Sequence, residues 1–405
     1  MKSIWRHLYL DRLKRYLTSP SAIALSGMRR VGKSVLMRQL KDDLEQTEKV
    51  VYIDKESLDF DGLRTAKDVI DYVDSASTVG ARGEMRYVLI DEVQLIDEWE
   101  RAVASLNGRD DTRVIISGSN AHLLSGELAT RIAGRYLVLP VFPLSLQEFS
   151  ELHSLLHPPL EDKRELFKLY LRTGGLPGLL HTDLSEELRS QMQRDIFHSI
   201  AMRDIIGRHA IRDVRLFEAV MAFIMDTVGS PVSAKKIADF LKKERRSISV
   251  DSVLNYLSYM REGYLLYEVP RYDLKGKRLL EVNHKYYLGD IGLRNGLLGY
   301  READISGLLE NLVFLELLRR GFTVRVGRMY DYEIDFVAEK ERERHYLQVS
   351  YLIETPDTLE RELRPLRAVD DQWPKTLLSL DEFRPRVFEG IRHHSIIDFL
   401  MGAGI

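Results

Sequence analysis

Residues 27–34 contain two glycines, a lysine and a serine in the spacing G-x-x-x-x-G-K-S. Glycines at these positions let the backbone curl so that successive N–H groups face phosphate oxygens. Lys33 would reach the β- and γ-phosphates, and the hydroxyl of Ser34 would hold Mg²⁺. The pattern therefore predicts a nucleoside triphosphate site formed by Gly27, Met28, Arg29, Arg30, Val31, Gly32, Lys33, Ser34 and Val35.

A pair of acidic residues follows an apolar run farther along the chain. Residues 87–90 are Tyr-Val-Leu-Ile, and Asp91 and Glu92 come directly after them. The run predicts a buried strand that delivers both carboxylates to the edge of a sheet. There Asp91 would contact Mg²⁺ through water, and Glu92 would polarise the water that attacks the γ-phosphate. With the glycine-rich loop, the pair predicts ATP hydrolysis in which Lys33 and Glu92 are catalytic.

Alternating strands and helices would position these side chains. Apolar runs of strand character occupy residues 22–26, 49–54, 87–90, 112–120 and 136–140, with helical patterns between them. Such alternation predicts a parallel sheet with helices on both faces and a ligand at the carboxyl ends of the strands. An amphipathic helix is expected before the first strand, within residues 1–20.

Further polar residues lie near the ends of the last two strands. Ser119 and Asn120 are candidates to orient the attacking water, although both residue types are also common in turns. Arg131 or Arg135 could approach the γ-phosphate of a neighbouring subunit as an arginine finger, which would require an oligomer. The same arginines equally suit a solvated helix end.

Composition limits the class of protein. The chain has 405 residues, 44% hydrophobic and 30% charged, enough for two or three domains. It contains no cysteine, which excludes disulfides, thiol catalysis and thiolate zinc sites. No apolar run suits a membrane span or a signal peptide, so we expect a cytoplasmic protein without membrane contact. Because the net charge is −3, any surface for nucleic acid must be local.

Residues 229–298 have a local excess of cationic residues that could form a surface for nucleic acid. Two short helices followed by two strands are expected there, which is the order of a winged helix. Between Val232 and Arg278, eleven Lys and Arg stand against six Asp and Glu. Four cations lie before the second helix and would contact DNA phosphates: Lys242, Lys243, Arg245 and Arg246. A protein partner is an equally open interpretation, since winged helices serve both purposes.

Several segments together resemble the prokaryotic AAA+/STAND-type P-loop ATPases, whose C-terminal region is nuclease-like. The resemblance rests on the P-loop and on Ile90-Asp91-Glu92-Val93-Gln94, Ser117-Gly118-Ser119-Asn120, Gly134-Arg135 and residues 140–149. It implies ATP and Mg²⁺ binding with slow or regulated hydrolysis. The expected α/β organisation is a P-loop ATPase core at 1–145, a helical lid at 146–228, a winged helix at 229–298 and a PD-(D/E)XK nuclease-like domain at 299–405.

The nuclease-like region departs from that family's pattern. PD-(D/E)XK nucleases bind metal with a helix Glu, a strand Asp and a Glu-x-Lys on the next strand. Glu310 and Asp335 match, but the third motif is Gln348-Val349-Ser350. An amide is a weak Mg²⁺ ligand and serine cannot replace an ammonium, so we expect an inactive site.

Three functions remain open from the sequence. The first is an ATPase that couples nucleotide state to contact with DNA or a partner. The second is a slow nucleotide-dependent switch that binds a protein. The third is a metal-dependent DNA nuclease that uses Glu310 and Asp335.

Overall fold

The structure is a computed structural model that describes residues 2–76, 85–119, 136–181, 185–381 and 386–404. The chain divides into two compact units, Met1–Val141 and Phe142–Ile405. The three C-terminal regions expected from the sequence, which begin at residue 146, therefore all lie within the second unit. Within the described ranges, no helix has the length and apolar character needed to cross a membrane.

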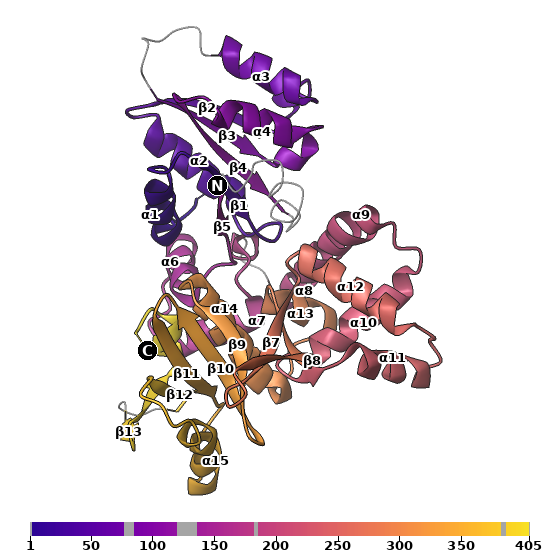
Figure 1. Cartoon of the computed structure of the whole chain (residues 1–405), viewed down its shortest axis with the longest axis vertical. Coiled ribbons are helices and arrows are strands. Elements are labelled where there is room, and N and C mark those ends of the chain that lie inside the picture. The colour runs from indigo at the N-terminus through magenta and orange to yellow at the C-terminus, as the bar shows by residue number, and fades with distance from the viewer. Residues whose placement is uncertain (1, 77–84, 120–135, 182–184, 382–385, 405) are drawn as a thin grey trace. The chain divides into compact units, whose positions relative to one another are not determined.

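A five-stranded sheet forms the centre of the first unit (Figure 1). Every neighbouring pair of strands is parallel, which confirms the predicted α/β fold. The carboxyl ends of the strands consequently meet at one edge. In sheet order the strands are β2 (Lys49–Asp54), β3 (Arg86–Asp91), β4 (Thr112–Gly118), β1 (Ala22–Ser26) and β5 (Tyr136–Pro140).

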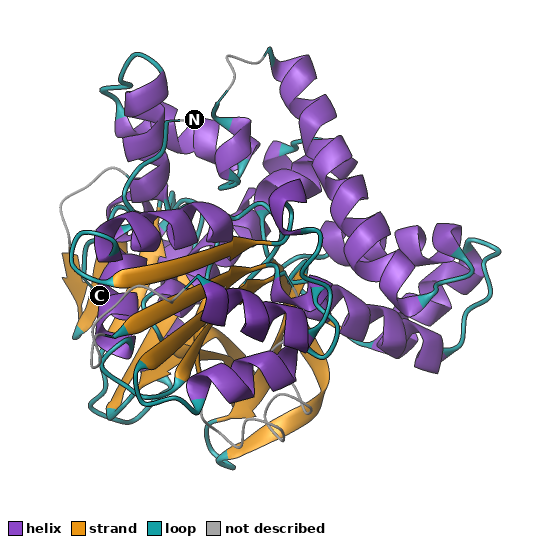
Figure 2. Ribbon diagram, turned by 90° about the horizontal axis from the view of Figure 1, so that it is seen from above, coloured by secondary structure: helices purple, strands orange, loops and turns teal. Residues whose placement is uncertain are grey.

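Helices lie on both sides of this sheet (Figure 2). On one face, α3 (Ala66–Ser75) and α4 (Trp99–Asn107) share a buried apolar cluster with alternate strand residues. On the other face lies α2 (Lys33–Leu44), which contacts β2, β3 and β4. The helix expected within residues 1–20 is α1 (His7–Tyr16), and it contacts α2 and β5.

The second unit contains a nine-stranded mixed sheet in the order β13-β14-β12-β11-β10-β9-β7-β8-β6. The two strands expected to form a wing, β7 and β8, belong to this sheet because β7 pairs in parallel with β9. The strand bounds are β6 (Pro231–Val232), β7 (Leu266–Asp273), β8 (Arg278–Leu288), β9 (Thr323–Met329), β10 (Tyr332–Lys340), β11 (Glu343–Val349), β12 (Lys375–Ser379), β13 (Arg386–Phe388) and β14 (Ile391–Ser395).

In chain order, the helices α6 to α10 of the second unit precede its first strand, and the helices α11 to α16 lie between or after its strands. Among them, α14 contacts β8, β9, β10 and β11 and places its buried side chains on the sheet. The bounds are α6 (Leu146–Leu156), α7 (Lys163–Thr173), α8 (Glu186–Ile200), α9 (Gly207–His209), α10 (Val214–Asp226), α11 (Ala234–Lys243), α12 (Val250–Glu262), α13 (Ile291–Leu298), α14 (Ile305–Arg319), α15 (Pro356–Arg367) and α16 (Ile396–Leu400).

Candidate functional site

The loop between β1 and α2 has the backbone that its glycines predict. Gly27 and Gly32 have φ angles of 155° and 99°, in the region that favours glycine. A Cβ atom at Gly27 would lie 2.2 Å from the carbonyl oxygen of Val141, so this position has no room for a side chain. The loop ends where Lys33 begins α2.

Lys33 is buried at the start of α2, with 4% of its surface exposed. Its Nζ atom donates to the carbonyl oxygens of Gly27, at 2.9 Å, and Met28, at 3.1 Å. The ammonium therefore lies against the loop whose N–H groups could bind an anion. The other residues predicted to bind nucleotide belong to the same loop and the first turn of α2: Arg29, Arg30, Val31, Gly32, Ser34 and Val35.

The N-terminal segment supports this loop. Arg6 is buried, and its guanidinium donates to the carbonyl oxygen of Val31 at 3.1 Å. The side chain of Gln39, on α2, donates to the carbonyl oxygen of Ile4 at 2.6 Å. Sequence reasoning missed Arg6, because its contact with the loop spans 25 positions and follows no local pattern.

Asp91 ends β3 and Glu92 follows it at the carboxyl edge of the sheet, and both are buried. The Ser117 hydroxyl donates to Asp91 and accepts from the backbone N–H of Glu92 at 3.1 Å. The Tyr52 hydroxyl donates to the other oxygen of Asp91 at 3.4 Å. Burial and the charge of Asp91 raise the pKa of Tyr52, so it remains a donor at neutral pH. Glu92 accepts a hydrogen bond from Gln94.

Ser117, rather than Ser119, contacts the Asp91 carboxylate and the backbone N–H of Glu92. The register of β3 and β4 places Ser117 beside Asp91, an adjacency that no local pattern could indicate. Ser119 is also buried, but its hydroxyl has no hydrogen-bond partner among the described residues, and the same holds for Ser26. Buried hydroxyls are usually hydrogen-bonded, so these two suit a polar ligand.

The other predicted residues of this site lie outside the described ranges. They are Asn120 and the two candidates for an arginine finger, Arg131 and Arg135. Their roles stay predictions.

The second unit brings Glu310 and Asp335 together as their order in the sequence predicts. Glu310 lies on α14 and Asp335 on β10, and both line a cavity of about 390 Å³. Gln348 and Ser350 line the same cavity, from the end of β11 and just beyond it. The Gln348 amide donates to Glu362 at 3.1 Å.

In the nuclease motif the lysine would stand at position 350, just after β11, where this chain has serine. Here an ammonium reaches the carboxylates from β8 instead. Lys285, on β8, is buried, and its Nζ atom lies 3.0 Å from Glu310, 3.0 Å from Glu333 and 3.3 Å from Asp335. Burial alone would lower the pKa of Lys285, but the acidic groups around it raise that pKa above its usual value. Sequence reasoning missed this lysine because it lies 25 and 50 positions before Glu310 and Asp335.

Burial also affects the acidic partners of Lys285. It raises the pKa of Glu310, and the nearby Asp335 carboxylate adds to the increase. It raises the pKa of Asp335 as well, against the opposing effect of Lys285. In the described part of the chain, no group of three or more His, Asp or Glu residues is arranged to hold a metal ion.

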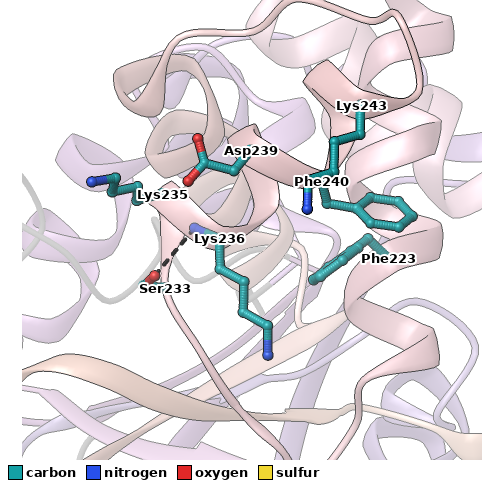
Figure 3. Close-up of a pocket in the computed structure, with 7 residues that line it drawn as sticks. All are labelled: Phe223, Ser233, Lys235, Lys236, Asp239, Phe240 and Lys243. Atoms are coloured by element: carbon teal, nitrogen blue, oxygen red, sulfur yellow. Dashed lines mark hydrogen bonds between the residues drawn. The ribbon is translucent and has the colours of Figure 1, made fainter.

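A basic surface lies on α11 and the turn after it. A cavity of about 440 Å³ is lined there by cationic, polar and aromatic side chains (Figure 3): Phe223, Ser233, Lys235, Lys236, Asp239, Phe240 and Lys243. The ring centroids of Phe223 and Phe240 are 4.8 Å apart, and Phe240 is 44% exposed.

The four cations predicted to contact DNA border this cavity or follow it in the chain. Lys242 and Lys243 end α11, Arg245 and Arg246 lie in the following turn, and all four are exposed. Within the described residues, neither these four nor Lys235 and Lys236 form a salt bridge. Elsewhere on the surface, cations such as Lys14 and Arg109 pair with carboxylates.

Comparisons with known proteins support the fold seen in the first unit. A family of AAA domains matches residues 19–150, and a domain of unknown function (DUF8612) matches residues 164–304. The chain is similar in fold to a Walker-type ATPase of Pyrococcus abyssi. The TM-score is 0.51 and the identity 16%, over 72% of this chain and 95% of that one.

Two relatives match along most of their sequences. An uncharacterized protein of Methanocaldococcus jannaschii is 29% identical over 84% of this chain and 76% of its own length. An uncharacterized protein of Haemophilus influenzae is 35% identical over 403 residues, which is 98% of each chain. The chain therefore belongs to the family of the Haemophilus influenzae protein, and its first unit is an AAA-type domain with the P-loop ATPase fold.

Proposed function

We propose that this chain is a Mg²⁺-dependent ATPase of the AAA type that couples its nucleotide state to contact with DNA or a protein partner. One observation carries the proposal. Buried Lys33, Asp91 and Glu92 lie at or next to the carboxyl edge of a parallel sheet, beside a loop with no room for a side chain at Gly27. This arrangement suits a polyphosphate and its metal ion.

The residues of the first unit fit ATP and Mg²⁺. The backbone of residues 27–35 would surround the phosphates, with Lys33 neutralising their charge. Ser34 and Asp91 would hold Mg²⁺, which supplies charge neutralisation for the transferred phosphoryl group. Glu92 would orient and polarise the attacking water, and its hydrogen bond from Gln94 fixes where the carboxylate lies.

Two further residues complete the proposed catalytic group. The buried Ser119 hydroxyl, with no partner in the described ranges, would orient water or a γ-phosphate oxygen. Arg135 would stabilise the transferred phosphoryl group, with Arg131 as the alternative.

Contact with nucleic acid is proposed for the basic surface of α11. Its cations form no ion pairs among the described residues, so their charge remains available for phosphates. They surround an exposed aromatic side chain, Phe240, on which a base could stack. Lys242, Lys243, Arg245 and Arg246 would extend this contact along the backbone of the nucleic acid.

A protein partner is the second candidate for the same unit, and the surface of α12 favours it. At the start of this helix the exposed residues are Val250, Asp251 and Leu254, with Asn255 beside them, and its exposed cation Arg261 is paired with Glu268. A helix that enters a DNA groove usually presents cations or amides, whereas an apolar and acidic face suits a protein. In this form the chain is a slow nucleotide-dependent switch.

A nuclease activity at Glu310 and Asp335 is not part of the proposal. Both carboxylates contact Lys285, and the next strand supplies the amide of Gln348 where a third carboxylate is expected. We propose that the nuclease-like region at 299–405 serves binding rather than cleavage.

Steady-state ATP hydrolysis with and without duplex and single-stranded DNA, at two salt concentrations, tests the proposal. We expect stimulation that weakens at high salt, because phosphate contacts release counterions. The variant Lys236→Gln/Lys243→Gln should lose most of this stimulation while keeping its rate without DNA. The control is Lys14→Gln, which removes a surface cation that is already paired with Asp43.

The other outcomes separate the candidates. ATP turnover that DNA does not change, together with unimpaired binding of a protein partner, would favour the switch. Absence of ATP binding by calorimetry would refute both forms of the proposal.

A further inference from the structure

Lys285 is the cation at the centre of the carboxylate group in the second unit. Only 3% of its side chain is exposed, against 15% for Glu310, 9% for Asp335 and 30% for Glu333. The three carboxylates come from α14 and β10, and the ammonium from β8. One buried cation therefore joins three segments of the fold.

Buried carboxylates need a compensating positive charge, which an ammonium or a divalent metal ion can supply. The distances from Lys285 to its partners, 3.0 to 3.3 Å, are those of ion pairs, and the contacts with Glu310 and Asp335 are also hydrogen bonds. A metal ion would need the same oxygen atoms at about 2.0 to 2.6 Å. The two cations cannot occupy this position together.

Neighbouring groups hold the carboxylates in this arrangement. The Tyr287 hydroxyl donates to the same Glu310 oxygen that contacts Lys285, at 3.0 Å. The backbone N–H of Val349 donates to the second oxygen of Asp335 at 2.9 Å. One oxygen of Glu310 and both oxygens of Asp335 are thus already engaged.

We propose that the Lys285 ammonium occupies the position where Glu310 and Asp335 would otherwise hold a divalent cation. The site is therefore closed to metal ions in the native chain. This inference concerns the second unit alone and does not depend on ATP hydrolysis by the first. It also gives a physical reason to expect no metal-dependent cleavage: the lysine would replace the metal instead of assisting it.

The test removes the ammonium and offers Ca²⁺ in its place. Lys285→Met retains most of the lysine's apolar stem but has no ammonium, and Ca²⁺ needs less contraction of the oxygen positions than Mg²⁺ does. We expect the variant to unfold at a lower temperature than wild type in EDTA. Ca²⁺ should raise the variant's unfolding temperature by about 5 °C and leave that of wild type unchanged.

The double variant Lys285→Met/Asp335→Asn is the matched control, because it lacks one of the two ligands. It should gain no stability from Ca²⁺. The same stabilisation of wild type and Lys285→Met would overturn the inference, and so would a folded Lys285→Met protein that does not respond to Ca²⁺.

A second measurement decides the matter if Lys285→Met does not fold. Tb³⁺, a luminescent analogue of Ca²⁺, can be excited through a nearby tyrosine such as Tyr287. Wild type and Asp335→Asn should give the same tyrosine-excited Tb³⁺ luminescence. A wild-type signal that Asp335→Asn removes would mean that metal enters beside Lys285, against the inference.

Discussion

Each of the two units contains a buried lysine and at least two buried acidic residues, but the contacts of these groups differ. In the first unit, Lys33 donates to the carbonyl oxygens of its own loop. In the described ranges, the donors to the Asp91 and Glu92 carboxylates are neutral hydroxyl and amide groups. In the second unit, Lys285 contacts three carboxylates directly.

This difference in hydrogen bonds and ion pairs is the reason to expect different roles for similar residues. Carboxylates that accept from neutral donors keep their negative charge available for a metal ion. Carboxylates that surround an ammonium have that charge compensated within the fold. The first arrangement is suited to binding and chemistry, and the second holds strands and a helix together.

The largest expected effect comes from Lys33→Ala, which removes the cation from the first site. Affinity for ATP should fall about 1,000-fold, on the order of 4 kcal/mol, because a buried charge that faces the phosphates is lost. Isothermal titration calorimetry measures the change, and Lys14→Ala is the surface control. An unchanged affinity would mean that Lys33 does not face the nucleotide.

Glu92→Gln keeps the shape of the side chain and removes its charge. Turnover of ATP should fall about 100-fold while ATP affinity changes little, since the lost group acts on water and not on the nucleotide. The matched change in the second site, Glu310→Gln, should leave ATP turnover at the wild-type rate. If Glu92→Gln and Glu310→Gln lowered ATP turnover equally, the proposal that only the first site hydrolyses ATP would be wrong.

Asp290 is a third kind of buried acidic residue, because its carboxylate accepts hydrogen bonds from backbone N–H groups. It accepts from Gly175 at 2.7 Å and from Leu293 at 3.2 Å, and burial raises its pKa from 3.8 to about 6. A raised folded-state pKa gives stability that is present below pH 3.8 and lost as pH rises through 6. The free energy of unfolding of wild type relative to Asp290→Asn should fall by about 2 kcal/mol between pH 4.5 and pH 7.5.

Urea unfolding of both proteins at the two pH values measures this difference. An unfolding free energy that differs by the same amount at both pH values would show that Asp290 does not titrate in this range.

The smallest effect is expected from Ser117→Ala, which removes a neutral donor to Asp91. Turnover should fall about tenfold, and the Mg²⁺ concentration for half-maximal rate should rise, because one hydrogen bond no longer positions the carboxylate. Ser119→Ala should lower turnover without changing the Mg²⁺ requirement. If Ser117→Ala leaves that requirement unchanged, Ser117 does not act through Asp91.

Much of the first unit could be predicted because its signals are local. The strand bounds at Lys49–Asp54 and Tyr136–Pro140 follow from short apolar runs, and the P-loop follows from eight consecutive residues. Ser117 could not be selected from its neighbours in the chain. Its contact with Asp91 depends on the register between two strands, and register is set by packing over the whole sheet.

The sequence by itself was enough to predict the kind of chemistry at each site: phosphate and metal binding at residues 27–35 and Asp91, and a degenerate carboxylate pair at Glu310 and Asp335. Only the tertiary structure decided which cation those carboxylates meet. Lys285 reaches them because β8 and β10 lie in one nine-stranded sheet beneath α14. A cation compensates a buried carboxylate only if the two groups lie close together in space. A local sequence pattern cannot predict which remote segments come that close.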